Sequence, residues 1–234
     1  VSRYPDAVRI LPPAPRPGSL RYERDRAVFR ATRRAQTAAR WTLAIADADS
    51  GVAATMRDFS CALGLDLTPA RAPRLAGLLA KVRVDGGLAT FRGKWRIGRR
   101  RPFEIDSGQI CAVRTITLDT SPDYPSGHAT WGWAAATILA ELAPDRATPL
   151  LTRGRAYGES RVVCGVHNLS AVEAGRTYGA ALVAAEHGVA AFRSDLEAAR
   201  AEISALRRQS SAGDAQSEAC RAEAEVLAAP AFAD

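Results

Sequence analysis

The sequence predicts an all-α fold, a compact single-domain helical bundle, and three observations support this prediction. Alanine is plentiful, whereas alternation of valine or isoleucine with polar residues is scarce, which favours helices over strands. Apolar residues recur at three- and four-residue spacing along several segments. A chain of 234 residues with 47% hydrophobic and 24% charged residues also suits one globular domain of ordinary size.

The first half of the chain begins with a proline-rich arm. Residues 1–18 contain Pro5, Pro12, Pro13, Pro15 and Pro17 and are expected to lie extended on the rest of the protein, so the domain itself would comprise residues 19–234. Helical spacing then predicts these helices: residues 20–49, residues 52–63, a helix that starts at Thr68-Pro69, and residues 88–98. The pair Gly86-Gly87 is expected to separate the last two.

The second half continues with a long segment of irregular pattern over residues 103–124. Loops of this length are uncommon and often functional, and this one could contain short strands around Val113 to Leu118. Helices are expected to follow over these segments: residues 125–142, residues 146–160, residues 167–187, a long helix containing Phe192 to Leu206, and a short one containing Cys220.

The formal charge of +7 points to an anionic partner, which could be nucleic acid, an anionic surface or a small anionic substrate. The sequence has no zinc-finger, RNP or homeodomain pattern, so nucleic acid is not expected to bind. Two members of the run Arg99-Arg100-Arg101 are expected to be solvated loop residues. The longest apolar stretches fall far short of the ~18 residues that cross a membrane, so no membrane insertion is expected.

The four cysteines are Cys61, Cys111, Cys164 and Cys220. None belongs to a C-x-x-C pair and the chain has only three widely spaced histidines, so a structural zinc site is not expected. Two disulfides in an oxidising compartment and four buried free thiols are equally compatible with this pattern.

Three segments carry residues suited to phosphate chemistry. They are Lys94 followed after six residues by Arg101-Pro102, then Pro125-Ser126-Gly127-His128, then Ser160-Arg161 followed after five residues by His167. A serine cap and a glycine at a helix start leave backbone amides free to bind an anion, and a histidine in the same turn can protonate a leaving oxygen. Alone, this second segment is a weak signal and is more often only a helix cap with a surface histidine.

The cations of the other two segments suit a phosphate group. Guanidinium groups bind phosphate oxygens in pairs and lysine adds a point charge, although any single arginine in so arginine-rich a chain could be a surface residue. Arg161 and His167 would lie on different faces of one unbroken helix. Gly165 between them predicts a break that turns both toward one pocket.

Taken together and in this order, the three segments closely resemble the three-part signature of the class A bacterial acid phosphatases, in the superfamily of type 2 phosphatidic acid phosphatases and vanadium haloperoxidases. The gaps of 22 and 31 residues between the segments also fit. The resemblance covers roughly residues 10 to 200.

The resemblance implies an all-helical phosphatase that hydrolyses phosphate monoesters at acidic pH without a metal or cofactor, although phosphate, vanadate or similar oxyanions can occupy such a site. It implies small substrates such as nucleotides or sugar phosphates, a homo-oligomer, and a periplasmic or secreted location after removal of a signal peptide. By the motif, His167 corresponds to the nucleophile and His128 to the acid that protonates the leaving alcohol. The residues that resemble the phosphate ligands are Lys94, Arg101, Ser126, Gly127 and Arg161.

The chain departs from the family pattern at Ala171, where an aspartate is expected four residues after the nucleophile. A carboxylate there could hold the second nitrogen of the imidazole, which alanine cannot do, and Glu173 would point elsewhere. The sequence therefore predicts a chain that binds phosphate esters but turns them over poorly. Either a degenerate paralogue or a deliberate substitution would explain this, and the intact remainder of the signature favours the second.

Expectations for several other residues complete the sequence analysis. His187 is expected to be structural, and Trp131 and Trp133 to pack in the core rather than line the substrate pocket. The compartment implied by the resemblance favours disulfides, with Cys111–Cys164 as the leading pairing and Cys61–Cys220 as the other. Two alternative functions remain: a non-enzymatic binding protein for phospho-ligands, motivated by Ala171, and a vanadate-dependent haloperoxidase, motivated by the similar anion site of that group.

Overall fold

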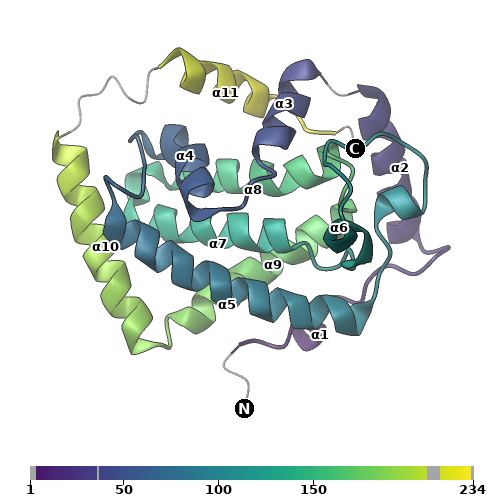
Figure 1. Cartoon of the computed structure of the whole chain (residues 1–234), viewed down its shortest axis with the longest axis horizontal. Coiled ribbons are helices and arrows are strands. Elements are labelled where there is room, and N and C mark those ends of the chain that lie inside the picture. The colour runs from purple at the N-terminus through teal and green to yellow at the C-terminus, as the bar shows by residue number, and fades with distance from the viewer. Residues whose placement is uncertain (1–3, 36, 210–216, 233–234) are drawn as a thin grey trace.

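Three helices form the centre of the computed structural model, which describes residues 4–35, 37–209 and 217–232. Helix α7 (Gly127–Leu142) lies between α8 (Ala147–Val163) and α9 (Leu169–Glu186) and packs against both. Helix α5 (Pro73–Ile97) runs along the same direction in front of them, and α10 (Ala190–Gln209) crosses one end (Figure 1). The described residues contain no strand, so the all-α prediction is confirmed.

The remaining elements surround this centre. They are α1 (Ala7–Ile10), α2 (Leu20–Ala35), α3 (Ala38–Ala46), α4 (Val52–Leu63), α6 (Ile116–Thr120), α11 (Glu218–Ala228) and two short 3₁₀ helices, η1 (Pro102–Glu104) and η2 (Pro144–Arg146). The main hydrophobic core joins α4, α5, α7 and α10. None of the helices in the described ranges is long and apolar enough to span a membrane.

Glycines on α9 allow its backbone to approach the first turns of α7 closely. A Cβ atom at Gly175 would lie 2.6 Å from the carbonyl oxygen of Ser126, and one at Gly179 would lie 2.6 Å from that of Thr130. Both distances are too short for any side chain, so the two helices can pack this way only with glycine at these positions. This close packing fixes the N-terminus of α7 against α9.

Several helix boundaries differ from those expected, including the expected start at Thr68-Pro69, because α5 begins at Pro73. Helix α5 continues through Gly86-Gly87, because a Cβ at Gly86 would lie 2.9 Å from the Leu182 side chain, and this packing outweighs the weak helix propensity of glycine, a cost of about 1 kcal/mol. The expected helix over 20–49 is two helices, with Thr37 capping α3. Residues 116–120 form the short helix α6, capped by Thr115, instead of strands.

The N-terminal arm lies on the domain as expected, although it includes the short helix α1. The phenol hydroxyls of Tyr178 and Tyr124 donate hydrogen bonds to the carbonyl oxygens of Pro5 (2.6 Å) and Pro12 (2.7 Å). Both tyrosine side chains belong to a small apolar cluster that also contains Ala171. The arm therefore covers the outer side of the start of α9.

Both expected disulfides are present, and the alternative of four free thiols is wrong. Cys61–Cys220 joins α4 to α11, and Cys111–Cys164 joins the 103–124 segment to the end of α8. Disulfides are typical of proteins in oxidising compartments.

Candidate active site

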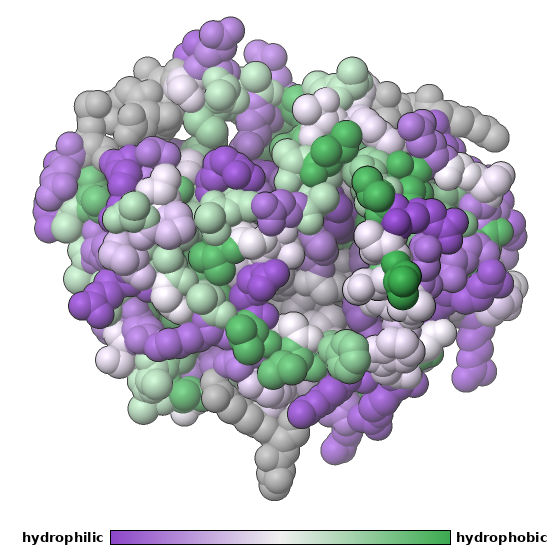
Figure 2. Space-filling model, viewed as in Figure 1, coloured by the Kyte–Doolittle hydropathy of each residue, from purple (hydrophilic) through white to green (hydrophobic). Residues whose placement is uncertain are grey.

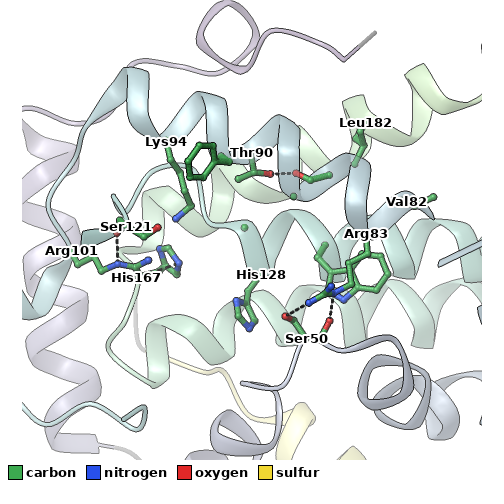
Figure 3. Close-up of a pocket in the computed structure, with 15 residues that line it drawn as sticks. Ser50, Val82, Arg83, Thr90, Lys94, Arg101, Ser121, His128, His167 and Leu182 are labelled. Atoms are coloured by element: carbon green, nitrogen blue, oxygen red, sulfur yellow. Dashed lines mark hydrogen bonds between the residues drawn. The ribbon is translucent and has the colours of Figure 1, made fainter. Parts of the chain in front are cut away.

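A pocket of about 360 Å³ opens between α5 and α7, on the face shown in Figure 2, where hydrophobic and hydrophilic side chains surround a central hollow. Five of the predicted site residues line it: Lys94, Arg101, Gly127, His128 and His167. Figure 3 shows Lys94, Arg101 and His167 together at one end, with His128 farther along. At the opposite end the pocket is lined by Val82, Leu182 and Arg83. It thus has a cationic end and an opposite end of mixed polarity.

The predicted break before His167 is confirmed. Helix α8 ends at Val163, Gly165 adopts a φ of +79°, and α9 begins at Leu169. A side chain at Gly165 would be strained in this conformation and would also meet the Arg33 guanidinium. The amides of Val166 and His167 both bond to the carbonyl of Arg161, which closes the turn and directs the imidazole into the pocket.

The hydrogen bonds of His167 define which ring nitrogen carries the proton. Its Nε2 lies 3.3 Å from Nη1 of Arg101, and its Nδ1 lies 2.8 Å from Oδ1 of Asp123. A guanidinium can only donate, so Nε2 must present a lone pair, and the proton must reside on Nδ1, where it is donated to the carboxylate. The neutral imidazole therefore presents an unprotonated, nucleophilic nitrogen at the cationic end of the pocket, next to the Arg101 guanidinium.

Asp123 is fully buried, and its neighbours are all donors. Oδ1 accepts from the backbone amide of Asn168 at 3.2 Å in addition to His167, and Oδ2 accepts from the side-chain amide of Asn168 at 2.8 Å. The Arg99 guanidinium lies 3.6 Å from Oδ2. Burial raises the pKa of Asp123, while Arg99 and Asn168 act in the opposite direction. With donors on both oxygens, we assign this side chain as an ionised carboxylate.

Arg99 links this carboxylate to α2 and α9. Its guanidinium donates to Asp25 and to the hydroxyl of Ser170, each at 2.6 Å, and Asp25 accepts from the amide of Ser170 at 2.9 Å. Arg99 is only 7% exposed, so the expectation that two members of the Arg99-Arg100-Arg101 run are solvated holds for Arg100 alone. Through these contacts the buried Arg99 holds Asp25, Ser170 and Asp123 next to one another.

Ala171 has no polar side chain to offer His167, yet His167 has a carboxylate partner. The expectation that this imidazole lacks an orienting carboxylate is therefore wrong, because Asp123 provides one from the loop before α7. Ala171 is itself fully buried in the apolar cluster with Tyr124 and Tyr178.

The two cations at the cationic end of the pocket, Lys94 and Arg101, donate hydrogen bonds to backbone carbonyls rather than to carboxylates. Lys94 donates to the carbonyl of Pro122 at 2.6 Å, and Arg101 donates to those of Ser121 and Val166 at 2.7 Å each. Burial and, to a smaller extent, the charge of nearby Arg101 lower the pKa of Lys94 to about 7. Burial also lowers the pKa of Arg101. Carbonyls do not neutralise these charges, so the pocket is prepared for an anion.

The first turn of α7 contributes backbone amides to the same end. Ser126 caps the helix by accepting from the amide of Ala129 at 3.3 Å, and its own amide donates to the carbonyl of Ala171 at 2.9 Å. Amides in the first turn of a helix have no partner within the helix, and the positive end of the helix dipole lies there. Gly127 lines the pocket at this point, which suits close approach by an oxyanion.

Arg161 and Ser126 are buried beside the pocket rather than on its surface. Arg161 donates to the carbonyl of Ala44, and among the described residues its Nε has no hydrogen-bond partner. Its charge lowers the pKa values of both His128 and His167. Arg161 therefore adds positive potential to the pocket and keeps a donor available.

His128 has a different environment from His167. Its Nε2 lies 2.9 Å from the carbonyl oxygen of Ala48, which can only accept, so Nε2 carries a proton and Nδ1 is the nitrogen that can exchange one. Burial and then the charge of Arg161 lower the pKa of His128 to about 4. A bound phosphate would offset the repulsion by the surrounding cations and favour the protonated ring.

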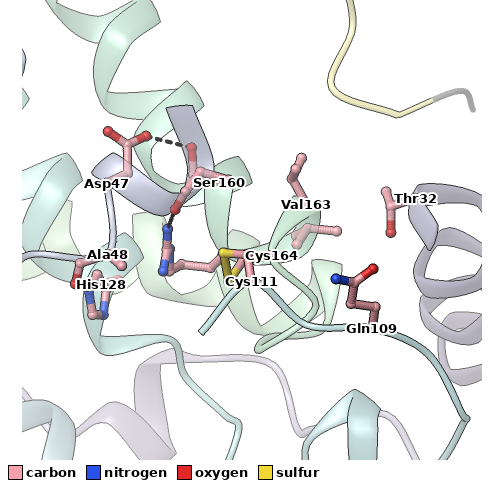
Figure 4. Close-up of a disulfide and its surroundings, with 12 residues drawn as sticks. Thr32, Asp47, Ala48, Gln109, Cys111, His128, Ser160, Val163 and Cys164 are labelled. Atoms are coloured by element: carbon pink, nitrogen blue, oxygen red, sulfur yellow. Dashed lines mark hydrogen bonds between the residues drawn. A yellow bond between two sulfur atoms is a disulfide. The ribbon is translucent and has the colours of Figure 1, made fainter. Parts of the chain in front are cut away.

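The end of α3 positions this second imidazole. Asp47 accepts from Ser160 and pairs with Arg153, each at 2.5 Å, and the next residue, Ala48, bonds His128. Figure 4 shows Asp47, Ala48, His128 and Ser160 in the surroundings of the Cys111–Cys164 disulfide. The Ser160-Arg161 segment is therefore anchored to α3 at the same place where α3 contacts His128.

The remaining expectations concern residues around the pocket. Trp131 is 7% exposed, donates to Thr55 at 2.8 Å and belongs to the core, but it also lines the pocket. His187 contacts Glu141 and Phe192 outside the pocket, as expected of a structural residue. In the described part of the chain, no group of three His, Cys, Asp or Glu side chains could hold a metal ion.

Sequence reasoning missed Asp123, Asn168 and Arg99. Two signals could have identified Asp123: it lies at the end of a long loop, and it comes directly before the Tyr124-Pro125-Ser126-Gly127-His128 segment.

Comparison with known proteins gives a consistent result. The model of the PAP2 superfamily matches residues 75–194. An acid phosphatase of Zymomonas mobilis subsp. mobilis is 40% identical over 197 residues, which are 84% of this chain and 75% of that protein. Non-specific acid phosphatases of Providencia stuartii and Salmonella typhimurium are each 35% identical, over 83% and 80% of this chain and 79% and 75% of their own lengths. The chain therefore belongs to the PAP2 superfamily and, within it, to the bacterial non-specific acid phosphatases.

Proposed function

We propose that this chain hydrolyses small phosphate monoesters through a phosphohistidine at Nε2 of His167. The observation that carries the proposal is the placement of this nitrogen. Its partner nitrogen is protonated and bonded to Asp123, so the lone pair of Nε2 faces the pocket beside Arg101. Membership of the acid phosphatases supports the same reaction class.

In the first step, Nε2 of His167 attacks phosphorus, the nitrogen–phosphorus bond forms and the ester phosphorus–oxygen bond breaks. The leaving oxygen takes a proton from Nδ1 of His128, whose Nε2–H remains bonded to Ala48. Lys94, Arg101 and the amides at the start of α7 bind the phosphoryl oxygens as charge develops on them. The Asp123 carboxylate stabilises the positive charge that the His167 ring acquires.

In the second step, a water molecule attacks the phosphorus of the phosphohistidine. His128, now neutral at Nδ1, takes a proton from this water, and the nitrogen–phosphorus bond breaks. Inorganic phosphate leaves and both imidazoles return to their starting states, so atoms and protons balance.

The poor turnover expected from Ala171 loses its physical reason, because that expectation assumed a nucleophile without a carboxylate. Asp123 bonds the imidazole nitrogen at 2.8 Å, so we propose a competent phosphatase. Neither a degenerate paralogue nor a deliberate inactivation is then needed to explain Ala171.

For substrates, we propose nucleotides or sugar phosphates, with the organic part extending from the cationic end toward Val82, Leu182 and Arg83. The absence of any cofactor requirement, a periplasmic or secreted location and a homo-oligomeric state stay predictions. The two disulfides support the location.

The test is hydrolysis of p-nitrophenyl phosphate at mildly acidic pH in EDTA, combined with trapping of the intermediate from a labelled phosphate ester. The reaction is quenched in alkali, because acid cleaves phosphohistidine. We expect turnover and a label on His167 that His167→Ala removes and His187→Ala retains. Tight binding of phosphate without turnover or label would instead favour a binding protein, and bromide oxidation with added vanadate and peroxide would favour a haloperoxidase.

A further inference from the structure

The carboxylate that contacts the nucleophile, His167, does not come from the position at which the family pattern has its aspartate. In that pattern it lies four residues after the nucleophile, where this chain has Ala171. Here the imidazole is met by Asp123, 44 residues before His167 and on a loop. The amide of Asp123 donates to the carbonyl of Arg99 at 2.8 Å, which fixes the loop at this residue.

The two positions are neighbours in space although they are far apart in the sequence. Tyr124, the residue after Asp123, packs in the same buried cluster as Ala171. The amide of Ser126 bonds to the carbonyl of Ala171 at 2.9 Å. The loop that carries Asp123 therefore lies beside position 171, near the start of α9. A carboxylate on this loop can reach the His167 imidazole from there.

The carboxylate is held by a set of donors that defines its orientation. Asn168 contacts both of its oxygens, one with its backbone amide and one with its side chain. Arg99 approaches the second oxygen and is fixed in turn by Asp25 and Ser170. Both oxygens of Asp123 thus have donors, and one of these donors is Nδ1–H of His167.

From these contacts we infer that Asp123 is the positioning residue of the nucleophile, in place of the missing carboxylate at position 171. It fixes the Nδ1–H tautomer of His167 and stabilises the charged phosphohistidine. The inference rests on the proposed function, in which Nε2 of His167 attacks phosphorus.

Asparagine cannot take over this role. Because both oxygens accept hydrogen bonds, the amide nitrogen of an asparagine would face donors on either side. If it faced His167, it would donate to Nδ1 and move the ring proton to Nε2, which removes the attacking lone pair. If the amide nitrogen took the place of Oδ2 instead, its N–H groups would face the side-chain amide of Asn168 and the Arg99 guanidinium, which are also donors.

The experiment compares Asp123→Asn and Asp123→Ala with Asp58→Asn as the matched control, since Asp58 is also a buried carboxylate but does not line the pocket. We expect the Asp123 variants to lose about 10⁴-fold in kcat, the scale observed when the orienting aspartate of a serine-protease triad is changed. Inhibition by inorganic phosphate should change far less, because the phosphate ligands are intact. Asp58→Asn should keep the native kcat. An Asp123→Asn enzyme within a few-fold of native kcat would overturn the inference.

A spectroscopic measurement keeps the inference testable if the variants lose stability. The chain has only three histidines, so ¹⁵N-labelled histidine gives a spectrum that His128→Ala, His167→Ala and His187→Ala can assign. We expect His167 in the native protein as the Nδ1–H tautomer and, in Asp123→Asn, a shift toward Nε2–H. An unchanged pattern for His167 would count against the inference.

Ala171→Asp tests the alternative that the native enzyme is impaired because position 171 has no carboxylate. The new carboxylate would be buried in the apolar cluster with Tyr124 and Tyr178, so we expect a lower melting temperature and no gain in kcat. A rise in kcat of about tenfold or more would show that the native chain is impaired and that Asp123 does not fill the role. If His167→Ala retained native activity, the proposed function itself would fail, which is a separate outcome.

Discussion

The two imidazoles in the pocket differ in how they are held. His167 is buried, with one ring nitrogen on the Asp123 carboxylate and the other beside Arg101. His128 is partly exposed, and its ring nitrogen bonds a neutral carbonyl, that of Ala48. A nucleophile that becomes cationic when it is phosphorylated needs a nearby negative charge. An acid that must release its proton does not, because a carboxylate partner would hold the proton more tightly.

The difference extends to the elements that support each ring. The His167 side depends on the loop before α7, on Asn168 and on Arg99. The His128 side depends on the end of α3, through Ala48 and the bond between Asp47 and Ser160. Changes on the two sides should therefore have different kinetic consequences.

The largest effect is expected for His167→Ala. Loss of the attacking nitrogen should lower kcat by about 10⁵-fold or more, the scale seen when a protease nucleophile is removed. The measurement is p-nitrophenyl phosphate hydrolysis, with His187→Ala as control because His187 lies outside the pocket. Residual activity of His167→Ala within tenfold of native would rule out a phosphohistidine at this residue.

His128→Ala should have a smaller effect that depends on the leaving group. For an alkyl phosphate, loss of a general acid should lower kcat/KM by about 10²- to 10⁴-fold. For p-nitrophenyl phosphate the loss should be much smaller, because nitrophenolate leaves without protonation. Equal losses on both esters would mean that His128 binds phosphate rather than transferring a proton.

The pH dependence of kcat/KM should separate the two rings further. His128 acts when protonated and its pKa is lowered to about 4, so kcat/KM for an alkyl phosphate should fall as the pH rises above that value. His167 acts when neutral. Burial and the charges of Arg101 and Lys94 hold its pKa well below 6.5, so its protonation should limit the rate only at pH values well below 6.5.

The matched measurement is the same profile for His128→Ala. In this variant the decrease of kcat/KM with rising pH should become smaller, and the part that remains should come from ionisation of the substrate. A profile unchanged from native would assign the alkaline limb to another group, such as Lys94, whose pKa is lowered to about 7.

These contrasts also explain what the sequence could predict. The predicted phosphate ligands and both histidines belong to short segments in fixed order, so the motifs were enough to propose their roles, and five of these residues line one pocket. The break at Gly165 was predictable because glycine marks turns. The position of Asp123 beside a motif could have marked it as a candidate, but its contact with His167 was not predictable, because the two residues are 44 apart and nothing local to either one specifies that contact.

Glycines gave both correct and wrong predictions about the helices. Gly86-Gly87 suggested a break in α5, but Gly86 is there because the Leu182 side chain approaches it closely. Local patterns cannot distinguish a glycine that ends a helix from one that lets another element approach. Likewise Arg99 looked like its exposed neighbour Arg100 until the fold brought Asp25 and Ser170 to it.

The smallest expected effect concerns the two disulfides. Replacing either pair by serine should cost about 2–4 kcal/mol of stability, by the usual effect of a cross-link on the unfolded chain. Cys111–Cys164 ties the segment that leads to Asp123 to the end of α8, so its loss should also lower kcat by roughly tenfold, whereas loss of Cys61–Cys220 should leave kcat near native.

The measurement is thermal unfolding together with kcat for Cys111→Ser/Cys164→Ser and for Cys61→Ser/Cys220→Ser. The leaving-group dependence should stay native in the first variant, because the Ala48 contact of His128 comes from α3 and not from this segment. If loss of Cys111–Cys164 instead lowered kcat/KM for alkyl phosphates alone, the disulfide would support the acid rather than the nucleophile. The division of the pocket into two independently supported imidazoles would then be wrong.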